Sequence, residues 1–152
     1  FEYVRRNASW DLFTDNVKYF NEIGKPLEAH SLYSIYSAFN LVEFYDFILE
    51  HNFKNIFWNL LESTGENCNA SVFRLPGALK EKAIQEIDRC VEKYKGEIGI
   101  DQLEIYKNNL INLTTPPAPK YFLDEIKSLE LLQPYHKTFK DVWPVEWELL
   151  NQ

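Results

Sequence analysis

Residues 27–61, LEAHSLYSIYSAFNLVEFYDFILEHNFKNIFWNLL, decide the fold. Their first part, 27–36, is rich in aromatic and branched side chains with a rough alternation, which predicts a β-strand. Residues 55–61 predict a second strand on the same grounds. Between the two, Asn40 can cap a helix, and Glu43 three residues later completes a capping-box pattern. A helix that connects two strands favours their parallel pairing, so the stretch predicts an α/β fold.

The segment before this stretch carries the best-marked helix of the sequence. Ser9 is a good N-cap residue, and the apolar residues after it recur at helical spacing. Gly24 closes the helix and Pro26 prevents its continuation. The apolar stripe consists of Trp10, Phe13, Val17 and Phe20. The order helix, strand, helix, strand is typical of a parallel sheet or a (β/α) barrel.

Helices dominate the second half of the sequence. An apolar stripe predicts a long helix that starts after Pro76 and ends at Gly96, and another helix is expected from Asp101 to about Leu113. A proline-rich break at 114–119 precedes two short helices, the second of which is expected to end before a proline. These short helices carry Phe122, Ile126, Leu129, Leu132, Phe139, Val142 and Trp143. No further strand pattern is present in this half.

Together the patterns predict a helix-rich α/β fold. We expect a partial (β/α) barrel with two or three parallel strands, followed by C-terminal helices. Residues 1–75 are assigned to the βα units and residues 76–152 to a helical C-terminal extension. A closed barrel of the common form needs eight strands. With so few strands, the sheet is expected to keep open edges and exposed apolar faces, which something else should cover.

Composition limits the classes of function. The 152 residues include 16 Lys and Arg against 23 Asp and Glu, which gives a formal net charge of −7. Such a chain does not neutralise phosphates by bulk attraction, so general nucleic-acid binding is not expected. The apolar runs are too short to span a bilayer, so no membrane partner is expected. The chain opens on Phe1 and contains no Met, which we interpret as a processed protein or a fragment of a longer one.

Two cysteines and three sequons bear on the compartment. Cys68 and Cys90 form no CxxC pair, and free thiols in a reducing, cytoplasmic setting are favoured over a disulfide between them. Asn7, Asn69 and Asn112 each begin an N-x-S/T sequon. The sequons leave a secreted, glycosylated domain as a weaker alternative.

Common catalytic motifs are absent from the sequence. It contains no GxSxG, Walker A, HExxH or GxGxxG pattern. The three histidines, His30, His51 and His136, are scattered along the chain. His30 lies in the middle of the first predicted strand, so we expect a hydrogen-bonded core residue rather than a catalytic one.

Short patterns spread along the chain carry a family resemblance. They are FEYVR at 1–5 with SWDLF at 9–13, SIYSAFN at 34–40 with Glu43, FRLPG at 73–77, and Phe139-x-x-x-Trp143-Pro144. In this order they resemble four parts of radical SAM enzymes: the stretch after the fourth strand, the fifth strand with its capped helix, the loop after the sixth strand, and the close of the chain. The similarity is greatest to the phage-type group whose C-terminal extension is called a twitch domain.

The resemblance implies the C-terminal half of a radical SAM oxidoreductase, which completes the barrel and shapes the SAM and substrate side. The family's CxxxCxxC motif holds a [4Fe–4S] cluster beside S-adenosylmethionine (SAM), and that motif is absent here. This chain alone is therefore expected to be inactive and to hold no cofactor, whereas the full-length parent would bind both. The missing N-terminal half of the barrel, or a self-association partner, is the expected binding partner, and the substrate is unknown.

Four residues are candidates for the SAM and substrate side. By resemblance, Arg5 lies near the carboxylate or ribose of SAM, and Asn40 lies near the same cofactor unless it serves only as a helix cap. Asn59 and Glu62, at the carboxyl end of the second strand, are candidates to face the substrate. No metal ligand is proposed. The alternative function is a non-catalytic α/β interaction module that docks a partner with the exposed apolar faces of its short sheet.

Overall fold

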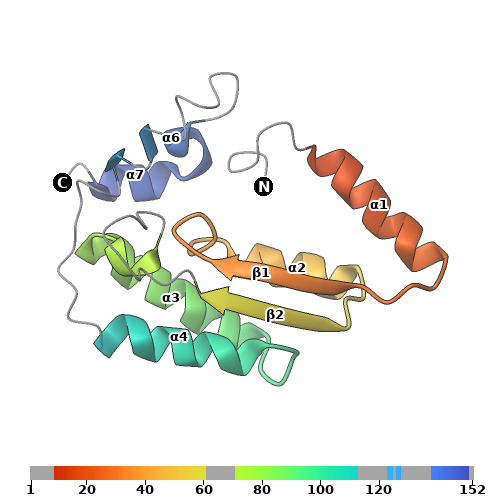
Figure 1. The fold of residues 1–152 in the computed structure, drawn as a ribbon. Coiled ribbons are helices and arrows are strands. Elements are labelled where there is room, and N and C mark those ends of the chain that lie inside the picture. Colours follow the sequence, from red (N-terminus) through yellow and green to blue (C-terminus); the bar gives the residue numbers. More distant parts are fainter. Residues whose placement is uncertain (1–8, 61–70, 113–122, 125, 128–137, 151–152) are drawn as a thin grey trace.

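The computed structural model describes residues 9–60, 71–112, 123–124, 126–127 and 138–150 (Figure 1). The described chain is helix-rich with one two-stranded parallel sheet, which confirms the predicted α/β class. Its elements are α1 (Trp10–Glu22), β1 (Glu28–Tyr33), α2 (Leu41–Glu50), β2 (Asn55–Leu60), the 3-10 helix η1 (Val72–Arg74), α3 (Gly77–Lys93), α4 (Ile100–Asn112), α6 (Phe139–Val142) and α7 (Pro144–Leu150).

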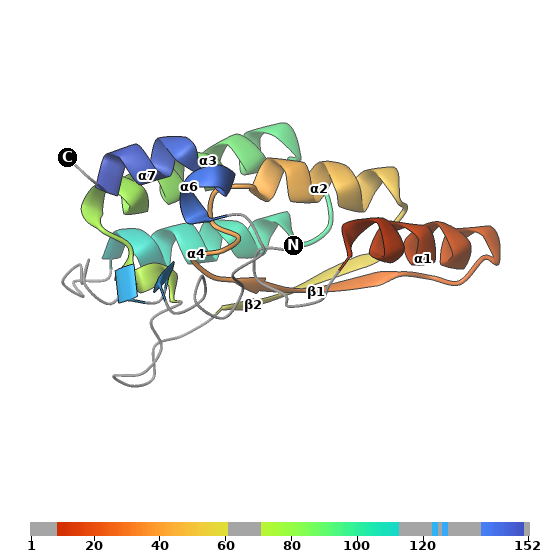
Figure 2. The same ribbon diagram turned by 90° about the horizontal axis from the view of Figure 1, so that it is seen from above.

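Among the described residues, the helices next to the parallel sheet lie on one side of it. β1 pairs with β2 from Glu28 opposite Asn55 to Tyr33 opposite Leu60, and α2 is the connection between them. α2, α3 and α4 all lie on the same side of the two strands (Figures 1 and 2). Alternate residues of β2, such as Trp58, are buried, and the residues between them are exposed. The predicted strand–helix–strand unit is confirmed.

β1 ends at Tyr33, before the predicted boundary at Tyr36, because serine side chains turn the chain. The Ser37 hydroxyl donates to the Leu32 carbonyl at 2.8 Å and accepts from the Ser34 N–H at 3.0 Å. Hydroxyl groups that bind nearby backbone in this way compete with strand pairing. The strand therefore stops where this local hydrogen bonding begins.

α1 begins and ends where local signals predict. The Ser9 hydroxyl accepts a hydrogen bond from the Leu12 N–H at 3.2 Å, which is the expected N-cap. After the helix, Gly24 adopts φ +68°, a conformation that favours glycine.

The start of α2 differs from the predicted capping box. Asn40 occupies the N-cap position, but its side chain makes no capping hydrogen bond. The Val42 N–H donates instead to Oε1 of Glu86 on α3, at 3.2 Å. Glu86 is buried, and Arg89 donates to its Oε2 at 2.8 Å. The prediction for Asn40 and Glu43 is therefore wrong, because a carboxylate from another helix holds the first turn of α2. A negative charge is favourable at that end of a helix.

α4 is hydrogen-bonded to β2, and the turn before α4 packs closely against the same strand. The carbonyl of Trp58 accepts a hydrogen bond from the Tyr106 hydroxyl at 3.1 Å and another from the Gln102 amide at 3.3 Å. Gly99 has φ +73°, and a Cβ there would lie 3.2 Å from Cβ of Ile56 and 3.3 Å from Nε1 of Trp58. This close approach explains why glycine precedes α4.

The C-terminal helices pack back onto α3. Thr138 and Asp141 form a reciprocal capping box at the start of α6. α7 begins at Pro144, where sequence analysis expects the helical region to end, because proline is well suited to the first position of a helix. Buried Glu146 of α7 pairs with Lys82 of α3, with Oε1 and Nζ 3.1 Å apart. This ion pair joins the end of the chain to the central helices.

Candidate functional site on the bare sheet face

The side of the sheet without helices exposes every second side chain of both strands. We call this surface the bare face. On it, Leu32 is 46% exposed and Phe57 is 44% exposed. The expected uncovered face is present among the described residues, but Leu32 and Phe57 are its only apolar members. The bare face consists of Glu28, His30, Leu32, Asn55, Phe57 and Asn59.

His30 lies on the bare face, so the prediction of a core histidine is wrong. The strand register places His30 opposite Phe57, and the two rings stack with centroids 4.8 Å apart and an interplanar angle of 21°. At the start of the strands, Oε1 of Glu28 accepts a hydrogen bond from the Asn55 amide at 2.9 Å. The bare face thus combines the apolar side chains of Leu32 and Phe57 with polar groups, of which Glu28 and Asn55 are hydrogen-bonded to each other.

The carboxyl end of the sheet holds the two sequence-predicted site residues that the structure describes. Asn59 lies opposite Leu32 near the end of β2 and is exposed on the bare face. Asn40 is exposed at the start of α2, after the turn that follows β1. This is the end of parallel strands at which α/β proteins place their sites. Arg5 and Glu62 lie outside the described residues.

Several other expectations also fall on parts of the chain that the structure does not describe. They concern the pattern at 1–5, the break at 114–119, and Asn7, Leu61, Cys68, Asn69, Leu113, Phe122, Leu129, Leu132 and His136. Their predicted roles stay predictions.

Sequence analysis did not single out Leu32 and Phe57 as the apolar residues of the bare face. In β2, Phe57 stands between the equally apolar Ile56 and Trp58. A period of two shows which side chains share a face only when apolar and polar residues alternate. The run of three apolar residues hides the phase, and the structure shows that Phe57 is the outward member.

A buried polar cluster lies on the covered side of the sheet. Burial raises the pKa of Glu86, against the opposing effects of the Val42 N–H and Arg89. Burial, together with the nearby Glu86, raises the pKa of Cys90 to about 12. Cys90 is a free thiol, and at neutral pH it stays protonated, unlike the thiolate that acts as nucleophile or metal ligand. Burial also raises the pKa of Tyr33, which packs in the same core.

Metal binding and membrane crossing find no support in the described residues. Within them, no group of three or more His, Cys, Asp or Glu side chains is placed to hold a metal ion. Among the helices described, none has both the length and the apolar character that a bilayer crossing requires.

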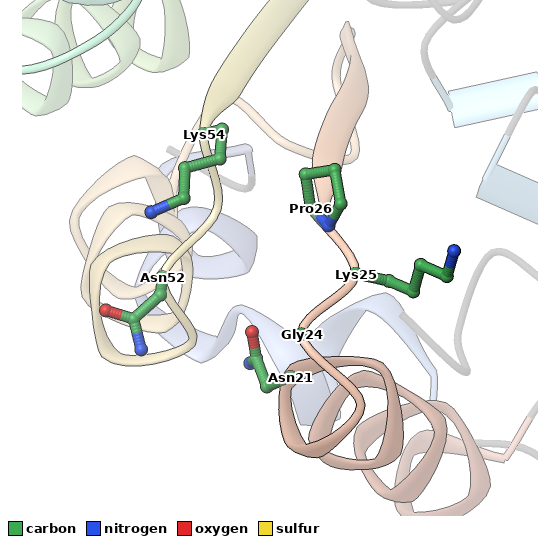
Figure 3. Close-up of a pocket in the computed structure, with 6 residues that line it drawn as sticks. All are labelled: Asn21, Gly24, Lys25, Pro26, Asn52 and Lys54. Atoms are coloured by element: carbon green, nitrogen blue, oxygen red, sulfur yellow. The ribbon is translucent and has the colours of Figure 1, made fainter.

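A cavity of about 330 Å³ opens at the opposite end of the sheet, where α1 and α2 end and the strands begin (Figure 3). The Asn21 amide donates to the His51 carbonyl at 2.7 Å beside it. In Figure 3 the ammonium groups of Lys25 and Lys54 extend away from each other, so they do not converge on one ligand. Helix C-termini carry partial negative charge, which opposes anion binding there. The cavity is lined by Asn21, Gly24, Lys25, Pro26, Asn52 and Lys54.

The bare face is therefore the strongest candidate for a functional surface within the described chain. Comparisons of the whole chain with known proteins add no family to this picture: no protein-family model, no curated protein and no solved structure matches it.

Proposed function

We propose that this protein is an interaction module that docks a second polypeptide on its bare face. The exposure of Leu32 and Phe57 on a sheet whose other side is covered by helices carries the proposal. At roughly 25 cal/mol per Å² of apolar area, covering what remains exposed of each side chain contributes on the order of 1 kcal/mol. Two such contributions are too small for a stable complex, so the partner must extend beyond these two side chains.

The chemistry of the bare face defines the partner. His30 is stacked on Phe57, and the single carboxylate of the bare face, Glu28, lies at its edge with a hydrogen bond from Asn55, so the Leu32 and Phe57 side chains have no charged neighbour directly opposite them in the register. A partner layer with branched aliphatic side chains and few charges complements it, as at the core of a stable interface. We place this complex in the cytoplasm, and the free thiol of Cys90 supports that compartment.

Photo-cross-linking at position 57 tests the proposal. The chain carries benzoylphenylalanine in place of Phe57, or in place of exposed Ile105 on α4 as the matched control. In the cells that express the protein, we expect one defined cross-linked partner from position 57 and none from position 105. Mass spectrometry identifies the partner and the cross-linked residue, which should lie in an apolar layer. No cross-link at 57, equal cross-linking at 105, or a cross-link only between two copies of this chain would contradict the proposal.

A second candidate narrows the partner to the N-terminal half of a radical SAM barrel. One observation favours this candidate: two neighbouring parallel strands have their helices on one side. The wall of a (β/α) barrel has the same arrangement. In that arrangement the bare face is the inner wall, and Asn59 faces the interior near its carboxyl end. The partner half would bring CxxxCxxC, the [4Fe–4S] cluster and SAM, and this chain would shape the substrate side.

This second candidate has its own readout. The partner cross-linked to position 57 should contain CxxxCxxC, and the anaerobic complex should convert SAM to 5′-deoxyadenosine. A Phe57→Ser chain should fail to support that conversion, whereas an Ile105→Ser chain should support it. A partner without the motif would refute the radical SAM assignment and leave the docking proposal in place.

A further inference from the structure

α1 carries two apolar surfaces, and only one of them is used within the described chain. On the inner surface Val17 is buried. Trp10 and Phe13 lie beside Phe47 of α2, with ring centroids 4.9 Å and 5.9 Å apart. α1 lies at the periphery of the molecule in both views (Figures 1 and 2). Within the described chain, the inner surface therefore accounts for the attachment of the helix, and its other side is exposed.

The second apolar surface of α1 faces solvent. Leu12 is 63% exposed, Tyr19 is 56% exposed, and Ile23, the C-cap residue, is 47% exposed. The spacing i, i+7, i+11 places the three side chains on one line along a helix of 3.6 residues per turn. We call this line the outer stripe. Half of the ten large apolar residues that are exposed in the described chain fall between Trp10 and Ile23.

Carboxylates border the outer stripe along one edge. Asp11, Asp15 and Glu22 lie on neighbouring positions of the helical wheel, and all three are exposed. Lys18 is the single cation of α1, and its ammonium lies 3.9 Å from Asp15. The helix thus presents an exposed apolar line beside an excess of negative charge. Basic amphipathic helices complement such a surface.

We propose that the outer stripe of α1 binds a basic amphipathic helix of another polypeptide. Its apolar side would cover Leu12, Tyr19 and Ile23, and its Lys or Arg side chains would reach Asp15 and Glu22. A second copy of this chain fits less well, because each copy brings the same excess of carboxylates and a net charge of −7. This site is separate from the bare face, and its test does not depend on the docking proposed there.

Peptide binding to the full chain tests the inference. The probe is a fluorescein-labelled Leu/Lys amphipathic peptide of about 14 residues, long enough for a helix to form on binding, with a Leu/Glu peptide of the same pattern as its counterpart. Fluorescence anisotropy measures Kd at about 50 mM and about 300 mM NaCl. We expect the Leu/Lys peptide to bind at least tenfold more tightly than the Leu/Glu peptide. Equal binding of both peptides would overturn the inference.

Paired variants locate the binding. Leu12→Ser with Ile23→Ser should weaken Kd about tenfold, which corresponds to about 1.4 kcal/mol. The matched pair Ile105→Ser with Ile111→Ser removes two similarly exposed residues from α4 and should leave Kd within about threefold. If both pairs weaken binding equally, or if the α1 pair has no effect, the peptide does not use the outer stripe.

Charge variants and two further measurements complete the test. Asp15→Asn with Glu22→Gln should reduce the salt dependence of Kd. Glu97→Gln with Glu104→Gln, which changes the net charge of the chain by the same amount, should not.

Hydrogen exchange of the unaltered chain should show peptide-induced protection at 10–23, so the inference stays testable if a variant does not fold. Sedimentation of the peptide-free chain should show a monomer. A dimer that Leu12→Ser with Ile23→Ser disperses would identify a second copy as the occupant and overturn the inference.

Discussion

Replacing Glu86 by Ala removes the carboxylate that holds the first turn of α2. The Val42 N–H, in a buried residue, then loses its acceptor. A lost helix cap costs about 1 kcal/mol and an unsatisfied buried donor about 1–3 kcal/mol. Because both describe the same hydrogen bond, we expect Glu86→Ala to lower the free energy of unfolding by about 2 kcal/mol. Urea unfolding at pH 7, followed by circular dichroism, measures it.

The control is Glu81→Ala, at an exposed position of the same helix. It should change the free energy of unfolding by no more than about 0.5 kcal/mol. Equal stability of the Glu86→Ala and Glu81→Ala chains would refute the assignment of Glu86 as the cap of α2.

Glu86→Gln separates the charge from the hydrogen bond, because Gln keeps an acceptor oxygen. Burial raises the pKa of Glu86 in the fold, with Glu43 adding to it and Arg89 opposing it. The unfolded chain therefore loses this proton at a lower pH than the folded chain. Relative to Glu86→Gln, the unaltered chain should lose stability as pH rises from the ordinary Glu range, about 4.3, through the raised pKa, and the difference should be constant above it. A difference that changes in the opposite direction, measured by urea unfolding across this range, would contradict the burial argument.

Three further substitutions test other contacts. Ser9→Ala should lower the free energy of unfolding by about 1 kcal/mol, because the Leu12 N–H loses its cap; an unchanged melting temperature would place the start of α1 elsewhere. Gly99→Ala should cost about 1–3 kcal/mol through its positive φ and close contacts, and urea unfolding should show a smaller loss for Gly96→Ala, where a Cβ meets open space. Trp143→Ala should cost about 3–5 kcal/mol in thermal unfolding because the side chain is buried; a negligible loss would show that the C-terminal helices are not held to the core.

Local signals predicted the elements whose causes are local. Ser9 and Gly24 mark the limits of α1, and aromatic and branched side chains mark β1 and β2. The cap of α2 could not be predicted in this way, because Glu86 lies more than forty residues after Asn40 and only the packing of α3 brings it there. A carboxylate in the middle of a helix gives no sequence signal that it is buried.

The site could be predicted only in part. Too few strands for the number of helices indicated an uncovered sheet face, and the described residues show one, with Leu32 and Phe57 as its apolar members. Which residues form that face depends on the phase of each strand, which the run Ile56, Phe57, Trp58 leaves undefined. The mid-strand position of His30 likewise did not show which side of the sheet it occupies, and the strand turns its ring outward onto Phe57. Phase is decided by the helices that cover one side of the sheet.

The central claim is that the bare face is open in the free chain and closed by a partner. Solvent relaxation by a neutral gadolinium chelate, observed on leucine methyl groups, measures this directly. In the free chain, we predict strong relaxation of Leu32 and little relaxation of buried Leu79. In the complex with the partner cross-linked at position 57, the relaxation of Leu32 should fall to the level of Leu79. A Leu32 signal that is already protected in the free chain, or that stays fully relaxed in the complex, would contradict the claim.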